Sequence, residues 1–143
     1  MTSHQISDNV AYLDFKFPRP TKQNSNSYVM IRIVNAYGPT SPKAAADPTL
    51  FTNFYNELDC AANCPSRYEL FFLGDFNSKL GKVTKKDDLN GLSQHIGMYG
   101  NGTRNRNGEE LLNFIINHDL FVCNTAFKHK MCHITTRTGY IRV

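Results

Sequence analysis

The order of hydrophobic and polar positions predicts two β-strands in the first forty residues. Apolar and polar side chains alternate from Ile6 to Phe17, with the period of a strand that has two different faces. A second strand is predicted from Tyr28 to Tyr37, and its one interruption, Arg32, favours an edge or partly solvated position. Between them, Pro18 to Ser27 is polar and contains two prolines, which predicts a turn.

A helix and a third strand follow. Asp47 and Pro48 are typical of an N-cap and a first helical position, and apolar residues then recur at helical spacing. The sequence therefore predicts a helix from Pro48 to about Ala62. Glu69 to Leu73 is a short apolar run without helical spacing, which is typical of a strand buried on both faces. A strand, helix and strand in this order imply a crossover connection and a layered α/β fold.

The second half of the chain is less regular. Gly74 to Asn107 is rich in glycine, asparagine and lysine and predicts a long loop. Asn107 with Glu110 resembles a capping box at the start of another helix. Leu120 to Asn124 and, more weakly, His133 to Thr138 predict two further strands.

Composition narrows the class of protein. The 143 residues are 41% hydrophobic, enough for one domain over positions 1–143 with a sizeable core, and the net charge of +4 is only mildly basic. No stretch has the ~18 consecutive apolar residues of a membrane span. The polar segment from Met1 to Asn9 lacks the apolar core of a signal peptide, so we expect an intracellular, reducing setting.

The four cysteines fit that setting. Cys60, Cys64, Cys123 and Cys132 do not form two CxxC pairs. Cys123 lies in an apolar run, where a free thiol packs well. A zinc site or disulfides remain alternatives, but we interpret these residues as structural or incidental.

Gly74-Asp75-Phe76-Asn77 is the first candidate site, at the end of the predicted strand. A carboxylate held there can accept a proton or face a metal, and a nearby amide can donate to a phosphoryl oxygen. The alternative is an Asx-turn, which the same residues favour. A nucleotide triphosphatase is excluded, because Gly81-Lys82 is followed by Val83 and lacks the spacing of a phosphate loop.

Asn35-Ala36-Tyr37-Gly38-Pro39-Thr40 is the second candidate site. Tyr37 ends a predicted strand immediately before a turn forced by glycine and proline. Its hydroxyl could donate a hydrogen bond to a phosphate from a rigid position. The alternative, a tyrosine that only covers the core at a strand end, is at least as common.

Taken in order, the segments 35–40 and 72–77 resemble the endonuclease/exonuclease/phosphatase superfamily. The segments 99–112 and 124–130 are similar to its non-LTR retrotransposon branch, which includes animal proteins labelled craniofacial development protein 2-like. The similarity runs from about Ile6 to Gly139. It implies an α/β (α+β) fold, an incomplete four-layer α/β sandwich, and descent from a Mg²⁺-dependent hydrolase that nicks DNA.

The resemblance assigns roles to four residues. It implies that Asp75 orients or deprotonates the attacking water, that Asn77 contacts the scissile phosphate and that Tyr37 lies near it. Thr40 stands at the next polar position, which is often Asn in the abasic-site enzymes. The resemblance also implies a DNA partner and a nuclear location if the retrotransposon role is retained. We expect no membrane association, because the sequence has no apolar stretch of the length of a membrane span.

Departures from the family pattern concern the metal and the catalytic histidine. The Gln-Glu segment, whose Glu binds Mg²⁺, has no counterpart upstream of Ile6, and the closing Ser-Asp-His has none either. The chain therefore resembles a domain truncated at both ends, with no metal ligand of its own that we can name. Because the members of a catalytic site act together, we expect negligible nuclease activity.

Basic residues of the second half could follow a nucleic-acid backbone. Lys79 begins a group that continues with Lys82, Lys85 and Lys86, and Arg104 and Arg106 lie in the next predicted loop. The alternative is a solvated loop whose charge Asp87 and Asp88 balance. A non-catalytic nucleic-acid-binding or interaction protein therefore stands beside the hydrolase as a second functional hypothesis.

Overall fold

The structure is a computed structural model that describes residues 1–19 and 27–128. The chain divides into two compact units, Met1–Asn77 and Ser78–Val143. The first contains β1 (Thr2–Gln5), β2 (Val10–Pro18), β3 (Tyr28–Tyr37), α1 (Ser41–Ala46), α2 (Thr49–Ala62) and β4 (Tyr68–Asp75). The second contains α3 (Lys85–Leu89), the 3₁₀ helix η1 (Leu92–Gln94), α4 (Arg106–Asn117) and the 3₁₀ helix η2 (Cys123–Thr125). This is a mixed α/β fold.

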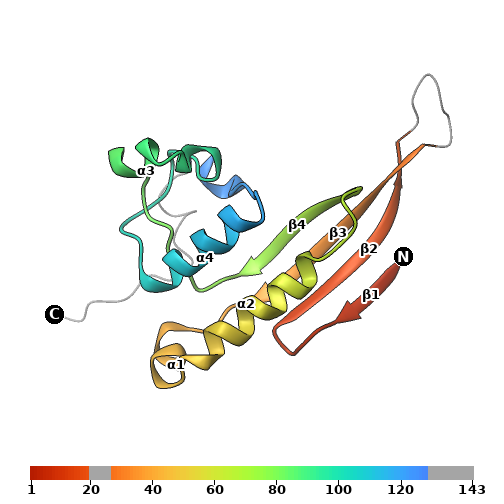
Figure 1. The fold of residues 1–143 in the computed structure, drawn as a ribbon, viewed down its shortest axis with the longest axis horizontal. Coiled ribbons are helices and arrows are strands. Elements are labelled where there is room, and N and C mark those ends of the chain that lie inside the picture. Colours follow the sequence, from red (N-terminus) through yellow and green to blue (C-terminus); the bar gives the residue numbers. More distant parts are fainter. Residues whose placement is uncertain (20–26, 129–143) are drawn as a thin grey trace. The chain divides into compact units, whose positions relative to one another are not determined.

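The first unit is built on a four-stranded sheet in the order β1-β2-β3-β4 (Figure 1). β1, β2 and β3 pair antiparallel, and β4 pairs parallel to β3. The predicted strand–helix–strand crossover is therefore confirmed, with α2 in the connection. Two elements were not predicted. The polar segment at the N-terminus forms β1 along β2, and the residues just after Pro39 and Thr40 form the short helix α1.

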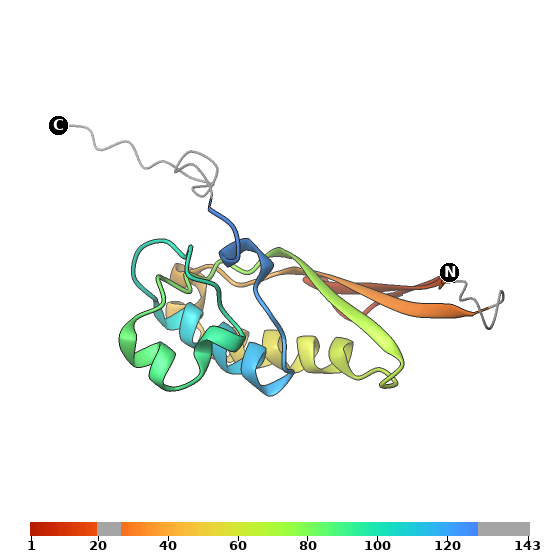
Figure 2. The same ribbon diagram turned by 90° about the horizontal axis from the view of Figure 1, so that it is seen from above.

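α2 lies along one face of the sheet (Figure 2). The buried apolar side chains of this unit come from β2, β3 and α2: Val10, Val34, Ala36, Phe51, Phe54, Leu58, Ala61 and Ala62. The N-cap of α2 is Pro48, so the prediction of Asp47 as the N-cap is wrong by one residue. The Asp47 Oδ1 still accepts hydrogen bonds from the Thr49 backbone N–H at 3.0 Å and from the Thr49 hydroxyl at 2.6 Å. The helix begins at Thr49, one residue later than expected.

The opposite face of the sheet, which we term the open face, is also largely apolar. Register and strand alternation place on it Ala11, Leu13, Phe15, Ile31, Ile33, Asn35, Phe71 and Leu73. The prediction that the third strand is buried on both faces is wrong. β4 is the last strand in the sheet order, and Phe71 and Leu73 are 50% and 54% exposed on the open face.

Arg32 is buried, and the prediction of an edge or partly solvated position is wrong. β3 lies between β2 and β4, and Arg32 is 6% exposed. Its guanidinium donates from Nε and Nη2 to the two carboxylate oxygens of Asp14, both at 2.7 Å, and from Nη1 to the Ala61 carbonyl at 2.9 Å. The hydrogen bond to Asp14 raises the pKa of Arg32. This ion pair joins two central strands to the end of α2.

The cysteines of the described residues are free thiols: Cys60, Cys64 and Cys123. Cys123 is exposed, so the prediction that it packs in an apolar run is wrong. Cys64 is half-buried, and burial raises the pKa of its thiol. Cys132 lies outside the described residues.

The second unit has more helix than predicted. α3 begins at a capping box. The Thr84 side chain accepts a hydrogen bond from the Asp87 backbone N–H, and the Asp87 carboxylate accepts one from the Thr84 backbone N–H. The long-loop prediction is therefore wrong over α3 and η1. α4 is confirmed as a helix, but Asn105 rather than Asn107 caps it, accepting from the Gly108 N–H at 2.9 Å. The buried apolar core of the second unit consists of Ile96, Leu111, Leu112, Phe114 and Ile115.

The strand predicted from Leu120 to Asn124 is wrong. Val122 forms only an isolated parallel bridge with Ile96, and the following residues form η2. The chain turns directly after α4, where Asp119 adopts a left-handed conformation with φ of 51°, so little extended backbone is left to pair. The strand predicted from His133 to Thr138 lies outside the described residues.

Candidate functional site

Tyr37 and Asp75 are brought together at the carboxyl ends of β3 and β4. The two residues are directly opposite each other in the parallel register. The next residue, Gly38, donates its backbone N–H to the Asp75 carbonyl at 2.7 Å. Alternation along β3 puts the Tyr37 side chain on the open face, and both Tyr37 and Asp75 are exposed. A phenol and a carboxylate therefore stand side by side at one edge of the sheet.

Gly74 allows β4 to approach β3 immediately before Asp75. Its φ is +127°, a conformation that side-chain-bearing residues rarely adopt. A Cβ atom at this position would lie 1.9 Å from the carbonyl oxygen of Ala36. The glycine of the Gly-Asp-x-Asn motif is thus required by the backbone, which fixes where Asp75 leaves the sheet.

Asn77 holds the two strand ends together. Its backbone N–H donates to Asp75 Oδ1 at 2.9 Å, which is the Asx-turn that the sequence left open as an alternative. Its Nδ2 donates to the Gly38 carbonyl at 2.8 Å, and its backbone is left-handed with φ of 48°. At least one amide hydrogen of Asn77 is therefore bonded to the turn that follows Tyr37.

Thr40 lies three residues beyond Tyr37, at the position before α1. It is half-buried, and its side chain makes no capping hydrogen bond to that helix. Of the first unit's candidates, the structure thus gathers Tyr37, Asp75 and Asn77 into one cluster and puts Thr40 on the same turn segment.

An open cavity of about 380 Å³ lies beside Tyr37, and the sequence did not reveal it. Its lining comes from β1, the β1–β2 turn, β2 and β3, and includes Gln5, Ala11 and Asn35. Asn35 is part of the Asn-Ala-Tyr motif, but the cavity beside it also requires β1, a strand that the hydrophobic pattern did not predict. Asp75 and Asn77 do not line this cavity.

The described residues do not provide a set of ligands for Mg²⁺ on their own. In residues 1–19 and 27–128, no three His, Cys, Asp or Glu side chains gather closely enough to hold a metal ion. Mg²⁺ prefers carboxylates and phosphate oxygens, and among the described residues Tyr37, Asp75 and Asn77 of this cluster, Asp75 is the one carboxylate. The donor set therefore does not fit the metal that the resemblance implies.

In the second unit, most of the predicted nucleic-acid-binding cations are exposed: Lys79, Lys82, Lys85, Lys86 and Arg106. Lys79 and the start of α4 are adjacent, because the Lys79 N–H donates to the Asn105 side chain at 3.0 Å. A Cβ on Gly108 would lie 1.9 Å from the Lys79 carbonyl oxygen, so this approach depends on glycine.

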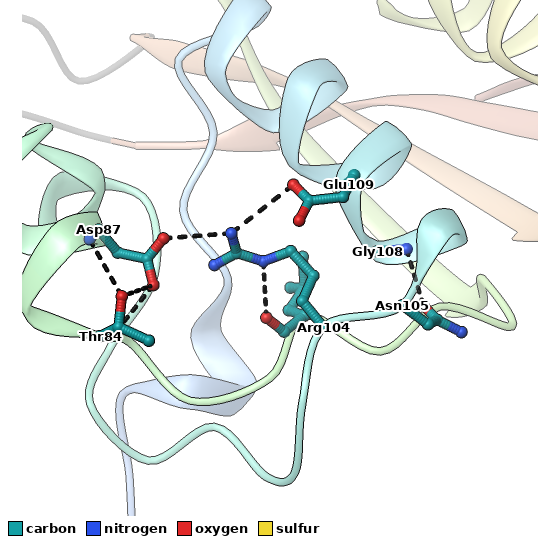
Figure 3. A network of polar contacts seen from close by, with 7 residues as sticks. Thr84, Asp87, Arg104, Asn105, Gly108 and Glu109 are labelled. Atoms are coloured by element: carbon teal, nitrogen blue, oxygen red, sulfur yellow. Dashed lines mark hydrogen bonds and ion pairs between the residues drawn. The ribbon is translucent and has the colours of Figure 1, made fainter.

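Arg104 differs from these cations because its guanidinium is bonded within the unit (Figure 3). Nη1 lies 3.1 Å from Asp87 Oδ1 and 3.7 Å from Glu109 Oε2, and Nε donates to the Leu80 carbonyl at 2.9 Å. Its side chain is only 15% exposed. The structure therefore gives Arg104 a part in holding α3, α4 and the loop together.

The Asp87 carboxylate joins the α3 cap to Arg104. We expect its replacement to lower the free energy of unfolding at neutral pH but not at strongly acidic pH. The hydrogen bond from the Thr84 backbone, aided by Arg104, lowers the pKa of Asp87. The Asp87 carboxylate thus contributes to the free energy of unfolding above the ordinary aspartate pKa of about 4. This contribution is lost as the pH falls through the lower pKa that Asp87 has in the folded state. Asp87→Asn should cost about 1–2 kcal/mol at neutral pH and little near pH 2.

Urea unfolding at both pH values measures this difference. Asp88→Asn is the matched control, because Asp88 is the exposed neighbour in the same helix. An Asp87→Asn penalty that is as large near pH 2 as at pH 7 would contradict the charged role of Asp87.

Comparisons with known proteins do not assign the chain to a family, so its class is described by its mixed α/β fold alone. No protein-family model matches the chain, and neither the curated proteins nor the solved structures give a match. Within the part of the chain that the structure describes, no helix has the length and apolar character needed to cross a membrane.

Proposed function

We propose that this chain is part of a phosphodiesterase domain of the endonuclease/exonuclease/phosphatase type, from its non-LTR retrotransposon branch. In this proposal a phosphate of the DNA backbone lies at Tyr37, next to the carboxylate of Asp75, and the chain hydrolyses phosphodiesters negligibly. If the retrotransposon role is retained, it acts in the nucleus.

The single observation that carries the proposal is the cluster of Tyr37, Asp75 and Asn77. Two motifs separated by a helix in the sequence meet at one sheet edge, with Tyr37 opposite Asp75 and Asn77 bonded to both strand ends. A phenol can donate to a phosphate oxygen, and its rigid strand position limits the entropy lost on binding. This arrangement supports a phosphate-facing edge better than three unrelated surface residues would.

Weak catalysis follows from what surrounds Asp75. Hydrolysis of a phosphodiester needs a cation to stabilise the developing charge and a group to activate water. Asp75 is exposed and could accept a proton, but the described residues supply no cluster of metal ligands beside it. Without the cation, the remaining groups bind and orient a phosphate without lowering the barrier by much.

A nicking assay on supercoiled plasmid in the presence of Mg²⁺ tests the expected inactivity. We expect no cleavage above a buffer blank from the full chain or from Asp75→Ala. Glu69→Ala is the control, because Glu69 is an exposed carboxylate on the same strand. Nicking by the chain that Asp75→Ala abolishes and Glu69→Ala preserves would overturn the inactivity and restore an active hydrolase.

The second candidate is a nucleic-acid-binding protein that uses the exposed lysines of the second unit. Lys82, Lys85 and Lys86 are exposed in and before α3, whereas the guanidinium of Arg104 is held by its neighbours. If the three lysines bind phosphates, replacing them all by glutamine should weaken DNA binding. The magnitude of the slope of log K against log salt concentration should then fall by up to about 0.9 for each phosphate that a lysine no longer neutralises. An unchanged salt dependence would remove this candidate.

A further inference from the structure

We propose that the cavity beside Tyr37 binds a nucleobase. The proposal rests on the proposed function, because it places a base next to the edge at which a backbone phosphate would lie. The motifs of the sequence assign no role to this cavity.

The cavity has a built floor in the sheet. Gln5, Ala11 and Asn35 lie in one row across β1, β2 and β3, since Gln5 is opposite Ala11 and Ala11 is opposite Asn35. All three line the cavity. The small side chain of Ala11 lies between two longer amides, and the Gln5 amide is oriented by a hydrogen bond from its Nε2 to the Ser7 carbonyl at 3.3 Å. Tyr37 lies two residues beyond Asn35 on the same face.

The rim of the cavity is held in place by hydrogen bonds. The Ser7 hydroxyl donates to Glu57 of α2 at 2.7 Å and accepts from the backbone N–H of Asn9 and of Val10, both at 3.1 Å. The Tyr37 N–H in turn donates to the Asn9 carbonyl at 2.9 Å. The β1–β2 turn is thus tied to both α2 and β3, so little ordering is needed when a ligand binds.

The charges of the lining favour a neutral ligand. The described residues that line the cavity include one carboxylate, Asp8, and no lysine or arginine. A phosphate or other anion would meet the carboxylate of Asp8, and His4 is the one basic side chain among the described lining residues. A ligand that binds through paired hydrogen bonds fits this lining better.

A nucleobase is such a ligand. The edge of a base presents hydrogen-bond donors and acceptors side by side, and the amides of Asn and Gln match adenine in this way. The volume of about 380 Å³ lies at the lower end of the range for small-molecule sites, roughly 300–1,000 Å³. Since Tyr37 lines the cavity and also stands opposite Asp75, a bound base and its phosphate would occupy neighbouring positions.

Adenosine, which carries no phosphate, tests the cavity separately from the phosphate-facing edge. We expect saturable shifts of the backbone amide signals of Gln5, Ala11 and Asn35 in ¹H–¹⁵N spectra of the full chain, and none with ribose or inorganic phosphate. Ala11→Leu fills part of the cavity and should raise the Kd at least tenfold. Thr2→Leu, on exposed β1 outside the cavity, should leave the Kd unchanged.

Asn35→Leu is a second variant at an exposed position, in case Ala11→Leu disturbs the sheet, and it should also raise the Kd at least tenfold. Circular dichroism checks that each variant is folded. Absent shifts with adenosine, equal shifts with ribose or phosphate, or an unchanged Kd in both folded variants would overturn the nucleobase site. Adenosine binding without any effect of Asp75 on DNA affinity would instead reject the proposed function and leave the cavity site standing.

Discussion

Replacing Arg32 by methionine is expected to lower the free energy of unfolding by about 3–5 kcal/mol, because it leaves the buried carboxylate of Asp14 without its partner. The guanidinium makes two bonds to that carboxylate and one to the Ala61 carbonyl at the end of α2. It also lies 3.9 Å from the centre of the Tyr12 ring. Urea unfolding followed by circular dichroism measures the loss.

The double variant Asp14→Leu/Arg32→Met separates the unpaired charge from the lost packing. Apolar replacement of both partners of a buried pair is often neutral or stabilising, so the double variant should recover most of the stability lost by Arg32→Met alone. If the double variant is as unstable as the single one, the unpaired Asp14 is not the cause. If Arg32→Met costs less than about 1 kcal/mol, the pair is not buried as described.

Gly74→Ala is expected to lower the free energy of unfolding by about 2–5 kcal/mol, the sum of backbone strain and a steric clash. The φ of +127° strains any side-chain-bearing residue, and the new Cβ would lie 1.9 Å from the Ala36 carbonyl oxygen. Relief of this clash must move β4 away from β3, and Asp75 moves with it. Urea unfolding measures the stability, and the backbone amide signals of Tyr37 and Asp75 report the displacement.

Gly102→Ala provides a matched control for the clash. Gly102 also has a positive φ, +68°, but a Cβ there meets no atom within 4 Å. We expect this change to cost only about 1 kcal/mol, the usual penalty of the left-handed conformation. If both variants lose the same free energy of unfolding, the close approach of β4 to β3 is not the reason that glycine is needed at position 74.

The elements that could be predicted from the sequence are those whose own residues carry the signal. β3 and α2 are predictable because their apolar residues recur with the period of the element. Burial is harder to predict, because it depends on neighbours. The apolar run of β4 predicts a strand buried on both faces, but its place at the end of the sheet order exposes Phe71 and Leu73. The prediction for Arg32 fails for the same reason, since its partner Asp14 lies on another strand.

The candidate site could be predicted only in part. Tyr37 and Asp75 are each identifiable as strand-end residues, and the parallel pairing of β3 with β4 brings them together. The bond from the Asn77 side chain to the Gly38 carbonyl could not be foreseen, because it depends on the backbone path of two separate turns. The sequence groups Arg104 with the exposed cations, since nothing in its local sequence identifies Asp87 and Glu109 as partners.

The most direct measurement is the change in DNA affinity on Asp75→Asn in the presence of EDTA. If a backbone phosphate lies at this strand end without a metal, the carboxylate repels it, and its neutralisation should tighten binding about two- to fivefold at low salt. Asparagine keeps the side-chain oxygen that accepts the Asn77 N–H, so the turn is preserved.

Glu69→Gln is the control, because it removes the same charge from the same strand about 20 Å away, beyond the Debye length of about 10 Å at 0.1 M salt. Fluorescence anisotropy with a labelled duplex measures both variants. Tighter binding by Asp75→Asn, with Glu69→Gln unchanged, is the result that a phosphate beside Tyr37 and Asp75 predicts. Equal affinities of wild type and Asp75→Asn, or weaker binding by Asp75→Asn, would contradict it.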